Sequence, residues 1–424
     1  MTAGSAMEEE IKGQPSRRPS REASPDVTLE KSSSTLPLHS SGSLRPSNFK
    51  VLGKLGFVPG WEGLRGLAVS MVMYSHVALH KEMIGTMGVG IFFVLSGFLI
   101  TGVLVSLIEK YDQARQQASG TSEKVSLGER LSYLPRFYLD RFVRLTPAMA
   151  LMVVIVTYQC RFYPTIRADA FAAFFYVHNF LPKQVDEPRL MFPGMFEHTW
   201  SLAVEEQFYI FWSLVIAFIV PLSQRRRAMA LGALISVSFF VRHYSGYAFL
   251  SDHMYGIDYR YAYTANAFKM FIGCAGRLLP MPTLWTKKWF GFVSTVTLLL
   301  GVYFWGWTLI SWGYDYRTEG AWLELWTSIL VLMVVIGSVN GNVILESQIL
   351  RFPGRISYSW YLWQFPCHAM VGWPANNYGP TGLAFAIATF TTFVIEEPIR
   401  NRYHVWRNAR AASQEDKPHT RRQE

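Results

Sequence analysis

The 424-residue sequence predicts an all-α protein that crosses a membrane about ten times. Three observations lead to this fold class. Half of the residues are hydrophobic and only 17% are charged, whereas a soluble chain of this length normally carries more charge. The apolar residues gather in blocks of about 16 to 23, close to the roughly 20 residues that a helix needs to cross a hydrocarbon core. Aromatic residues make up 15% of the chain, which is typical of proteins with aromatic girdles at the membrane surfaces.

The charge of the connections orients these spans. The expected spans are about 62–79, 86–108, 146–163, 199–221, 228–243, 260–279, 289–310, 322–339, 356–373 and 378–395. If the chain starts inside, the cytosolic segments hold 29 of the 40 Lys and Arg, and the outer loops hold five. Basic connections stay on the cytosolic side. We therefore expect a multi-pass membrane protein with both termini in the cytosol. Segment 165–182 is expected to lie at the outer surface without crossing.

The sequence divides into three expected parts. Residues 1–59 are rich in Ser and Pro and have no apolar stretch, so they are predicted to be a disordered cytosolic tail. Residues 60–400 form the transmembrane domain, and 401–424 form a basic cytosolic C-terminal tail. The net charge of +10 does not indicate nucleic-acid binding, because the basic residues are spread among loops rather than massed on one domain.

The small residues of the second span and the cysteines carry less information. Five glycines between 85 and 102 indicate close helix packing or room for a ligand to approach the backbone, and both can hold. The cysteines are Cys160, Cys274 and Cys367. They have no metal-ligand spacing and lie in or beside apolar runs, so we expect buried thiols and no metal site.

The first span carries the clearest functional signal, in WEGLRGLAVSMVMYSH. Arg65 and His76 are eleven residues apart, which places them on nearly the same helix face and about 16 Å apart along the axis. Ionisable residues inside membranes are costly and mark functional sites. The pair therefore suggests a bound anionic ligand with a titratable base above it.

Other polar clusters stand in apolar surroundings. Arg141 and Arg144 share a face before the third span and can clamp a phosphate or merely anchor the helix at the cytosolic surface. Glu205 and Glu206 are adjacent carboxylates just inside the fourth span. The last span ends in FVIEEPIR, where the two glutamates are expected at the interface and Pro398 is expected to end the helix.

In this order the motifs resemble the acyltransferase-3 family of integral membrane acyltransferases. This family includes bacterial O-acetyltransferases of surface polysaccharides and many fungal homologues, and the likeness covers about residues 57–405. The matching motifs are LRGLAV with His76, FFVLSGFLI, R-x-x-R-x-x-P at 141–147, WSLAVEEQFY at 200–209, RISYSWYLW at 355–363 and the final Glu-Pro.

The resemblance implies transfer of an acyl group, most simply acetyl, from acyl coenzyme A to a hydroxyl. A base is needed to accept the hydroxyl proton, and His76 is the best candidate. Glu205 is expected to orient or charge-pair His76 or Arg65. Arg65, Arg141 and Arg144 are expected to hold the donor's phosphates. Further site candidates are Glu206, Arg260, Tyr361 and Gln364. The implied partners are the bilayer, acyl coenzyme A and a hydroxylated acceptor, with no permanently bound cofactor.

One residue departs from the family pattern. Many members read Tyr-Leu-Trp-His in the ninth span, where this chain has Gln364 after Tyr361. An amide can donate and accept hydrogen bonds but cannot carry a proton through a catalytic cycle. We therefore expect Gln364 to orient ligand and His76 to act as base. His368, one turn later, is expected to be structural.

The acceptor is open at this stage. The Ser/Pro-rich tail resembles fungal homologues, several of which acylate secondary metabolites, and neither end shows a folded extracytoplasmic domain. A small-molecule acceptor is therefore expected, with a glycan or cell-wall polysaccharide as the alternative. A transporter or a non-catalytic scaffold also fits many spans with buried charges. The lack of an internal repeat speaks against the first, and the combination of Arg65, His76 and Glu205 against the second.

Overall fold

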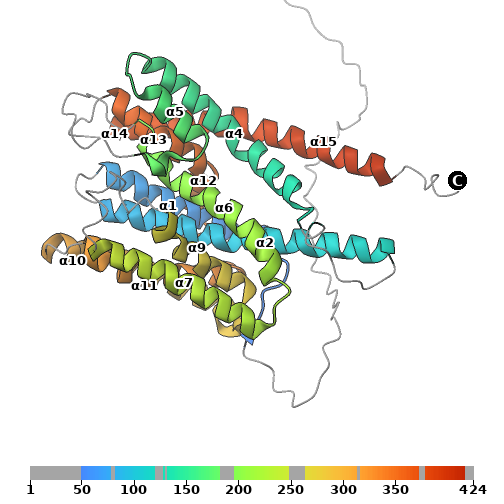
Figure 1. Ribbon diagram of the computed structural model, residues 1–424. Coiled ribbons are helices and arrows are strands. Elements are labelled where there is room, and N and C mark those ends of the chain that lie inside the picture. Colours follow the sequence, from blue (N-terminus) through green and yellow to red (C-terminus); the bar gives the residue numbers. More distant parts are fainter. Residues whose placement is uncertain are drawn as a thin grey trace, which may run out of the picture. The chain divides into compact units, whose positions relative to one another are not determined.

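The expected spans fall on helices in the computed structural model, which describes residues 49–77, 82–119, 128, 131–181, 195–247, 263–312, 316–371 and 378–415 (Figure 1). The all-α class is thereby confirmed. The α-helices are α1 (Pro59–Val77), α2 (Glu82–Ser119), α4 (Leu134–Gln159), α5 (Ile166–Phe174), α6 (Trp200–Ile219), α7 (Gln224–Tyr247), α9 (Tyr263–Leu278), α10 (Lys288–Trp312), α11 (Tyr316–Gly337), α12 (Gln348–Arg355), α13 (Ser357–Val371), α14 (Tyr378–Phe390) and α15 (Glu397–Glu415). Short elements are β1 (Phe49–Lys50), β2 (Met281–Pro282), the 3₁₀ turns η1 (His178–Phe180), η2 (Glu197–Thr199) and η4 (Thr283–Thr286), and the π-helical η5 (Thr391–Glu396).

Several helices are built to cross a membrane. Within the described residues, five stretches are long and apolar enough by length and composition: Met83–Gln113, Glu197–Ile219, Lys288–Trp305, Gly320–Gly337 and Tyr378–Arg410. Among the other helices on the expected spans, α13 has only 15 residues and α9 only 16. Ten crossings therefore remain a prediction. Helix α5 has nine residues, or about 14 Å, and is too short to cross by itself.

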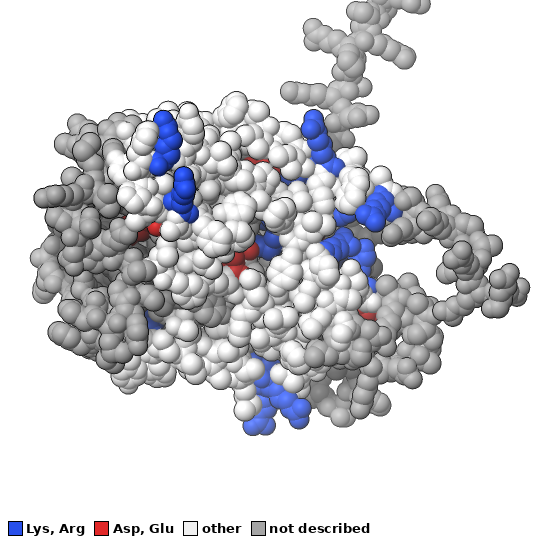
Figure 2. Space-filling view, turned by 45° about the horizontal axis from the view of Figure 1, so that its top comes forward, with Lys and Arg blue, Asp and Glu red and all other residues white. Residues whose placement is uncertain are grey.

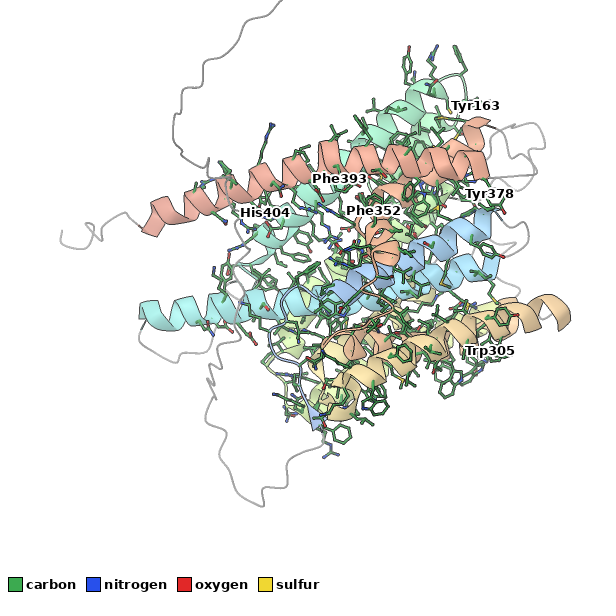
Figure 3. All side chains as sticks on the ribbon, turned by 180° about the vertical axis from the view of Figure 1, so that it is seen from behind. Tyr163, Trp305, Phe352, Tyr378, Phe393 and His404 are labelled. Carbon is green, nitrogen blue, oxygen red and sulfur yellow. The ribbon has the colours of Figure 1, made fainter. Side chains whose placement is uncertain are left out.

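The surface has the character of a protein in lipid. The face in Figure 2 is broadly neutral, with scattered Lys, Arg, Asp and Glu. Many large apolar side chains are exposed, such as Tyr303 at 65% and Phe304 at 61% on α10. Tyr163, Tyr378 and Trp305 lie toward one end of the helices and His404 toward the other (Figure 3). This placement suits an aromatic girdle at one membrane surface.

Helix α1 packs against α2, α12 and α13. Its buried side chains belong to both of the hydrophobic clusters that form the core. Glycines permit the closest approaches. A Cβ at Gly63 would lie 1.7 Å from the carbonyl oxygen of Leu345, and one at Gly97 on α2 would lie 2.0 Å from that of Met270 on α9. At Gly90 the nearest atom would be Cδ of Lys269, at 3.9 Å. Close packing therefore explains Gly97, whereas Gly90 borders open space.

This contrast predicts different effects on stability. We expect Gly97→Ala to lower the free energy of unfolding by about 3 kcal/mol or more, because the new methyl meets rigid backbone. Gly90→Ala, on the same helix, should be close to neutral. Melting temperature and membrane yield of the purified variants test this, and equal melting of the two would contradict the packing explanation.

Both expected tails need correction where the structure describes them. Residues 49–58 were expected to be disordered, but β1 pairs antiparallel with β2, and the Arg277 guanidinium donates a 2.5 Å hydrogen bond to the Leu52 carbonyl. Residues 401–415 are not a separate tail, because they continue α15 and Arg407 binds Asp140 of α4. Residues 1–48 and 416–424 lie outside the described residues.

The expected helix end at Pro398 is also wrong. The π-helical η5 leads directly into α15, and Pro398 lies in the first turn of that helix. A proline within a continuous helix disturbs the regular hydrogen-bond pattern, and the π-helical turn just before Pro398 is such an irregularity.

Candidate active site

A pocket lies where α1, α2, α6 and α13 meet. Three of the residues singled out in the sequence line it, namely Arg65, Glu205 and Tyr361. Ser96, Ser201, Ser357 and Tyr358 add hydroxyl groups, and Val89, Phe92, Phe93, Leu95, Leu99 and Leu202 supply the apolar wall. A largely apolar cavity with a few converging polar groups is the usual form of a small-molecule site.

The Glu205 carboxylate is held by hydroxyls on two helices. Its Oε1 accepts hydrogen bonds from Ser96 on α2 and from Tyr209, one turn further along α6. Ser201, Glu205 and Tyr209 are spaced by four residues, so α6 presents them on one face. A carboxylate in this setting is fixed in place and can stabilise a cation or polarise a bound hydroxyl.

Glu206, the adjacent carboxylate, pairs with Arg141. Nη2 of Arg141 lies 2.5 Å from Oε1 of Glu206, and its guanidinium carbon stands 3.7 Å above the Tyr209 ring. Both charges are largely shielded, with side-chain exposures of 16% and 19%. The Arg141 guanidinium is therefore already paired with Glu206 and stacked on Tyr209. A phosphate would have to compete with the Glu206 carboxylate to bind it.

Arg65 and Arg144 are placed differently. Arg65 lines the pocket, and its buried Nε has no hydrogen-bond partner. Arg144 is exposed and close enough to Arg65 for the two charges to repel each other. Two neighbouring guanidiniums, one of which lines a pocket, suit an anionic group, because the anion relieves their repulsion.

The two glutamates at the end of the last span also have partners. Arg355 forms two hydrogen bonds of 2.8 Å with the Glu397 carboxylate, and this contact raises the pKa of Arg355. Glu396 accepts a hydrogen bond from Ser359 of α13. The two final glutamates therefore join η5 and α15 to α12 and α13 rather than merely facing an interface.

His76 lies in the last turn of α1, away from Arg65. Its ring contacts Phe365 edge to face, with 5.3 Å between the centroids, and it interacts electrostatically with His368 and Glu197. The expected pairing with Glu205 is therefore not the one found. Glu205 is bound by hydroxyls at the pocket, and the carboxylate next to His76 is Glu197, which precedes α6.

Tyr361 connects the two regions. Its hydroxyl lies 2.7 Å from Ser201 Oγ and donates a 3.0 Å hydrogen bond to the His198 carbonyl. Gln364, one turn further on, is 1% exposed. Polar groups thus run from Arg65 and Glu205 through Tyr361 to the end of α1 that holds His76.

Other expectations are settled by local contacts. His368 Nδ1 lies 2.8 Å from the Gln364 carbonyl and its Nε2 lies 3.2 Å from Thr381 Oγ1, so the expected structural role fits. Lys269 is 2% exposed and forms a 3.0 Å ion pair with Glu324. Arg260 lies outside the described residues. Cys160, Cys274 and Cys367 are buried free thiols, as expected.

Several site residues escaped the sequence reasoning. Ser96 and Glu197 come from segments far from their partners in the chain, so no local signal marks them. Ser201 and Tyr209 had a usable signal, since both are one turn from Glu205. Among the described residues, no group of three His, Cys, Asp or Glu side chains is arranged to hold a metal ion.

These features define an integral membrane protein with a pocket that holds a guanidinium, a carboxylate and several hydroxyl groups. The chain belongs to the acyltransferase-3 family, whose acyltransferase domain matches residues 58–396.

The curated relatives are similar over most of this chain. The peptidoglycan O-acetyltransferase OatA of Listeria monocytogenes is 29% identical over 83% of this chain and 59% of its own length. The putative peptidoglycan O-acetyltransferase YrhL of Bacillus subtilis is 30% identical over 73% of this chain and 48% of its own. The O-acetyltransferase OatA of Staphylococcus aureus is 27% identical over 84% of this chain and 60% of its own length.

The chain thus spans about half to three fifths of the length of these relatives. They are bacterial, so the expected likeness to fungal members remains a prediction. No solved structure matches the chain.

Proposed function

We propose that the protein is a membrane O-acetyltransferase that moves an acetyl group from acetyl coenzyme A to a hydroxyl of a glycan. The observation that carries the proposal is the pocket lined by Arg65, Glu205 and Tyr361. It offers a cation for the donor, and His76 lies further along the helix α1 that carries Arg65.

In the proposed reaction the acceptor oxygen bonds to the thioester carbonyl carbon, and the carbon–sulfur bond breaks. His76 takes the proton from the attacking hydroxyl, and this proton ends on the departing coenzyme A thiol. Glu197 is the carboxylate that stabilises the positive charge that His76 gains in this step.

The proposed donor site uses the arginines unequally. Arg65 and Arg144 bind donor phosphates, whereas Arg141 shapes the pocket wall through Glu206 and Tyr209. The distance of about 16 Å between Arg65 and His76 along α1 requires an extended donor, with its phosphates at one end of the pocket and its thioester toward the other. Coenzyme A has this form.

The proposed acceptor differs from the small molecule expected from the sequence. Two of the named relatives carry peptidoglycan in their names, which favours the glycan alternative. A secondary metabolite as acceptor has no such support. The acceptor reaches His76 from the side opposite the donor.

The proposed orientation places both termini in the cytosol, because the basic connections accumulate there. A reporter that is active only outside the cytosol should stay silent when fused after Glu424 and become active when inserted after Arg167. A strong signal from the C-terminal fusion would contradict the ten-span topology and the proposed entry side of the donor.

The function itself is tested with membranes that contain the full chain. We expect isotope-labelled acetyl coenzyme A and chitotriose, an N-acetylglucosamine trisaccharide, to yield an alkali-labile acetyl ester that mass spectrometry detects. An excess of small aliphatic alcohols should compete poorly. Membranes that consume no donor and acetylate neither acceptor would refute the proposal.

A further inference from the structure

We propose that His198 and Gln364 form the acceptor subsite and bind neighbouring hydroxyl groups of a sugar. This inference rests on the proposed function and adds the residues that recognise the acceptor. It starts from two buried polar side chains whose hydrogen-bonding groups are unused.

His198 and Gln364 are both fully enclosed by protein. Their exposed fractions are 4% and 1%. Neither amide atom of Gln364 has a hydrogen-bond partner, and the His198 ring has only the Leu362 backbone nearby, outside normal hydrogen-bond geometry. Buried polar groups are nearly always paired, and each unpaired group costs about 1–3 kcal/mol. These underused buried groups therefore indicate a site that a polar ligand completes.

Helix α13 brings these groups together. Tyr361, Gln364, Phe365 and His368 recur at intervals of three and four residues, so they occupy one face of the helix. Phe365 on this face stacks on the His198 ring at 5.3 Å and 18°, and it also contacts His76. His198 and His76 interact electrostatically. His198 thus lies near His76, and Gln364 lies one turn from Tyr361 on the helix α13, which packs against η2 and α1.

The remaining contacts hold His198 in place without using its imidazole nitrogens. Tyr361 donates its hydroxyl proton to the His198 backbone carbonyl, and the Phe365 ring supports one face of the imidazole. The His198 ring is therefore positioned by its neighbours while its donor and acceptor remain available. A residue with only a packing role would not need two polar ring atoms there.

The chemistry of these groups selects the class of ligand. A neutral imidazole offers one donor and one acceptor, and the carboxamide offers both kinds of group. A hydroxyl also donates and accepts, so two adjacent hydroxyls of a sugar match this set. A phosphate or carboxylate would find the Glu197 carboxylate nearby, whereas the guanidiniums of Arg65 and Arg144 lie at the other end of α1.

The test separates acceptor binding from donor use. His198→Phe keeps a ring against Phe365 but removes both nitrogens, and Gln364→Leu removes the amide at similar volume. We expect each variant to raise the KM for chitotriose about tenfold, as loss of a hydrogen bond to the acceptor predicts. The KM for acetyl coenzyme A should stay unchanged, because the donor phosphates are assigned to Arg65 and Arg144. Gln364→His should restore most of the acceptor affinity, because an imidazole again offers a donor and an acceptor.

Cys367→Ala is the matched control, since Cys367 is buried on α13 but lies off this face. Variants are compared at equal amounts of folded protein, measured by size-exclusion chromatography of a fluorescent fusion. A wild-type KM for chitotriose in both His198→Phe and Gln364→Leu would overturn the subsite. Donor hydrolysis without any sugar ester in wild-type membranes would overturn the sugar acceptor. Absence of both donor use and ester formation would instead refute the proposed function.

Discussion

We expect His76→Ala to lower turnover by about 10²- to 10⁴-fold, the usual contribution of a positioned general base. The KM for the donor should change little, because the donor phosphates are assigned to Arg65 and Arg144, about 16 Å away along α1. Ester formation by membranes is the measurement. It must be normalised to the amount of folded protein, because loss of a polar side chain can also destabilise the helix packing.

Two further variants distinguish a base from a structural histidine. His76→Gln keeps hydrogen-bonding capacity but cannot accept and release a proton, so it should be as inactive as His76→Ala. Tyr74→Phe alters a half-exposed residue of the same helix and should retain activity. If well-folded His76→Ala membranes form the ester at a near wild-type rate, His76 is structural and another base has to be sought.

The second large effect is expected at Arg65. Its Nε is buried without a partner at the pocket wall, so its charge is available to an anion. Charged hydrogen bonds contribute about 1.5–3 kcal/mol. Arg65→Ala should therefore raise the donor KM by about 10- to 100-fold and also reduce turnover, because the thioester is positioned less well. Arg65→Lys should recover part of the loss, since lysine keeps the charge but not the fork geometry.

Arg351→Ala is the control for Arg65. Arg351 faces the same helix but forms a 3.0 Å ion pair with Glu62 and does not line the pocket. Its loss should leave the donor KM unchanged. Raising the salt concentration should weaken donor binding more in wild type than in Arg65→Ala. An unchanged donor KM in Arg65→Ala would show that the phosphates bind elsewhere.

Much of the fold follows from local sequence patterns. The positions of the membrane helices follow from the length of apolar blocks, because each helix satisfies its own backbone hydrogen bonds and needs no partner to form. The sequence predicted the ends of ordered segments least well where contacts with distant parts of the chain decide them. Residues 49–58 are ordered through Arg277, more than two hundred residues away, and α15 is held through Asp140 of α4.

In the candidate site, too, some features follow from the sequence and others depend on how the helices pack. The sequence by itself determined that Arg65 and His76 lie on one face of one helix, because helix periodicity acts within a few turns. The same periodicity would have placed Ser201 beside Glu205, although the sequence reasoning did not use it. Only the tertiary structure decided which charges meet: Glu205 with Ser96, Glu206 with Arg141, and Glu197 rather than Glu205 beside His76. Adjacent residues on a helix point about 100° apart, so which neighbouring helix each one reaches depends on how the helices pack, and no local pattern records that packing.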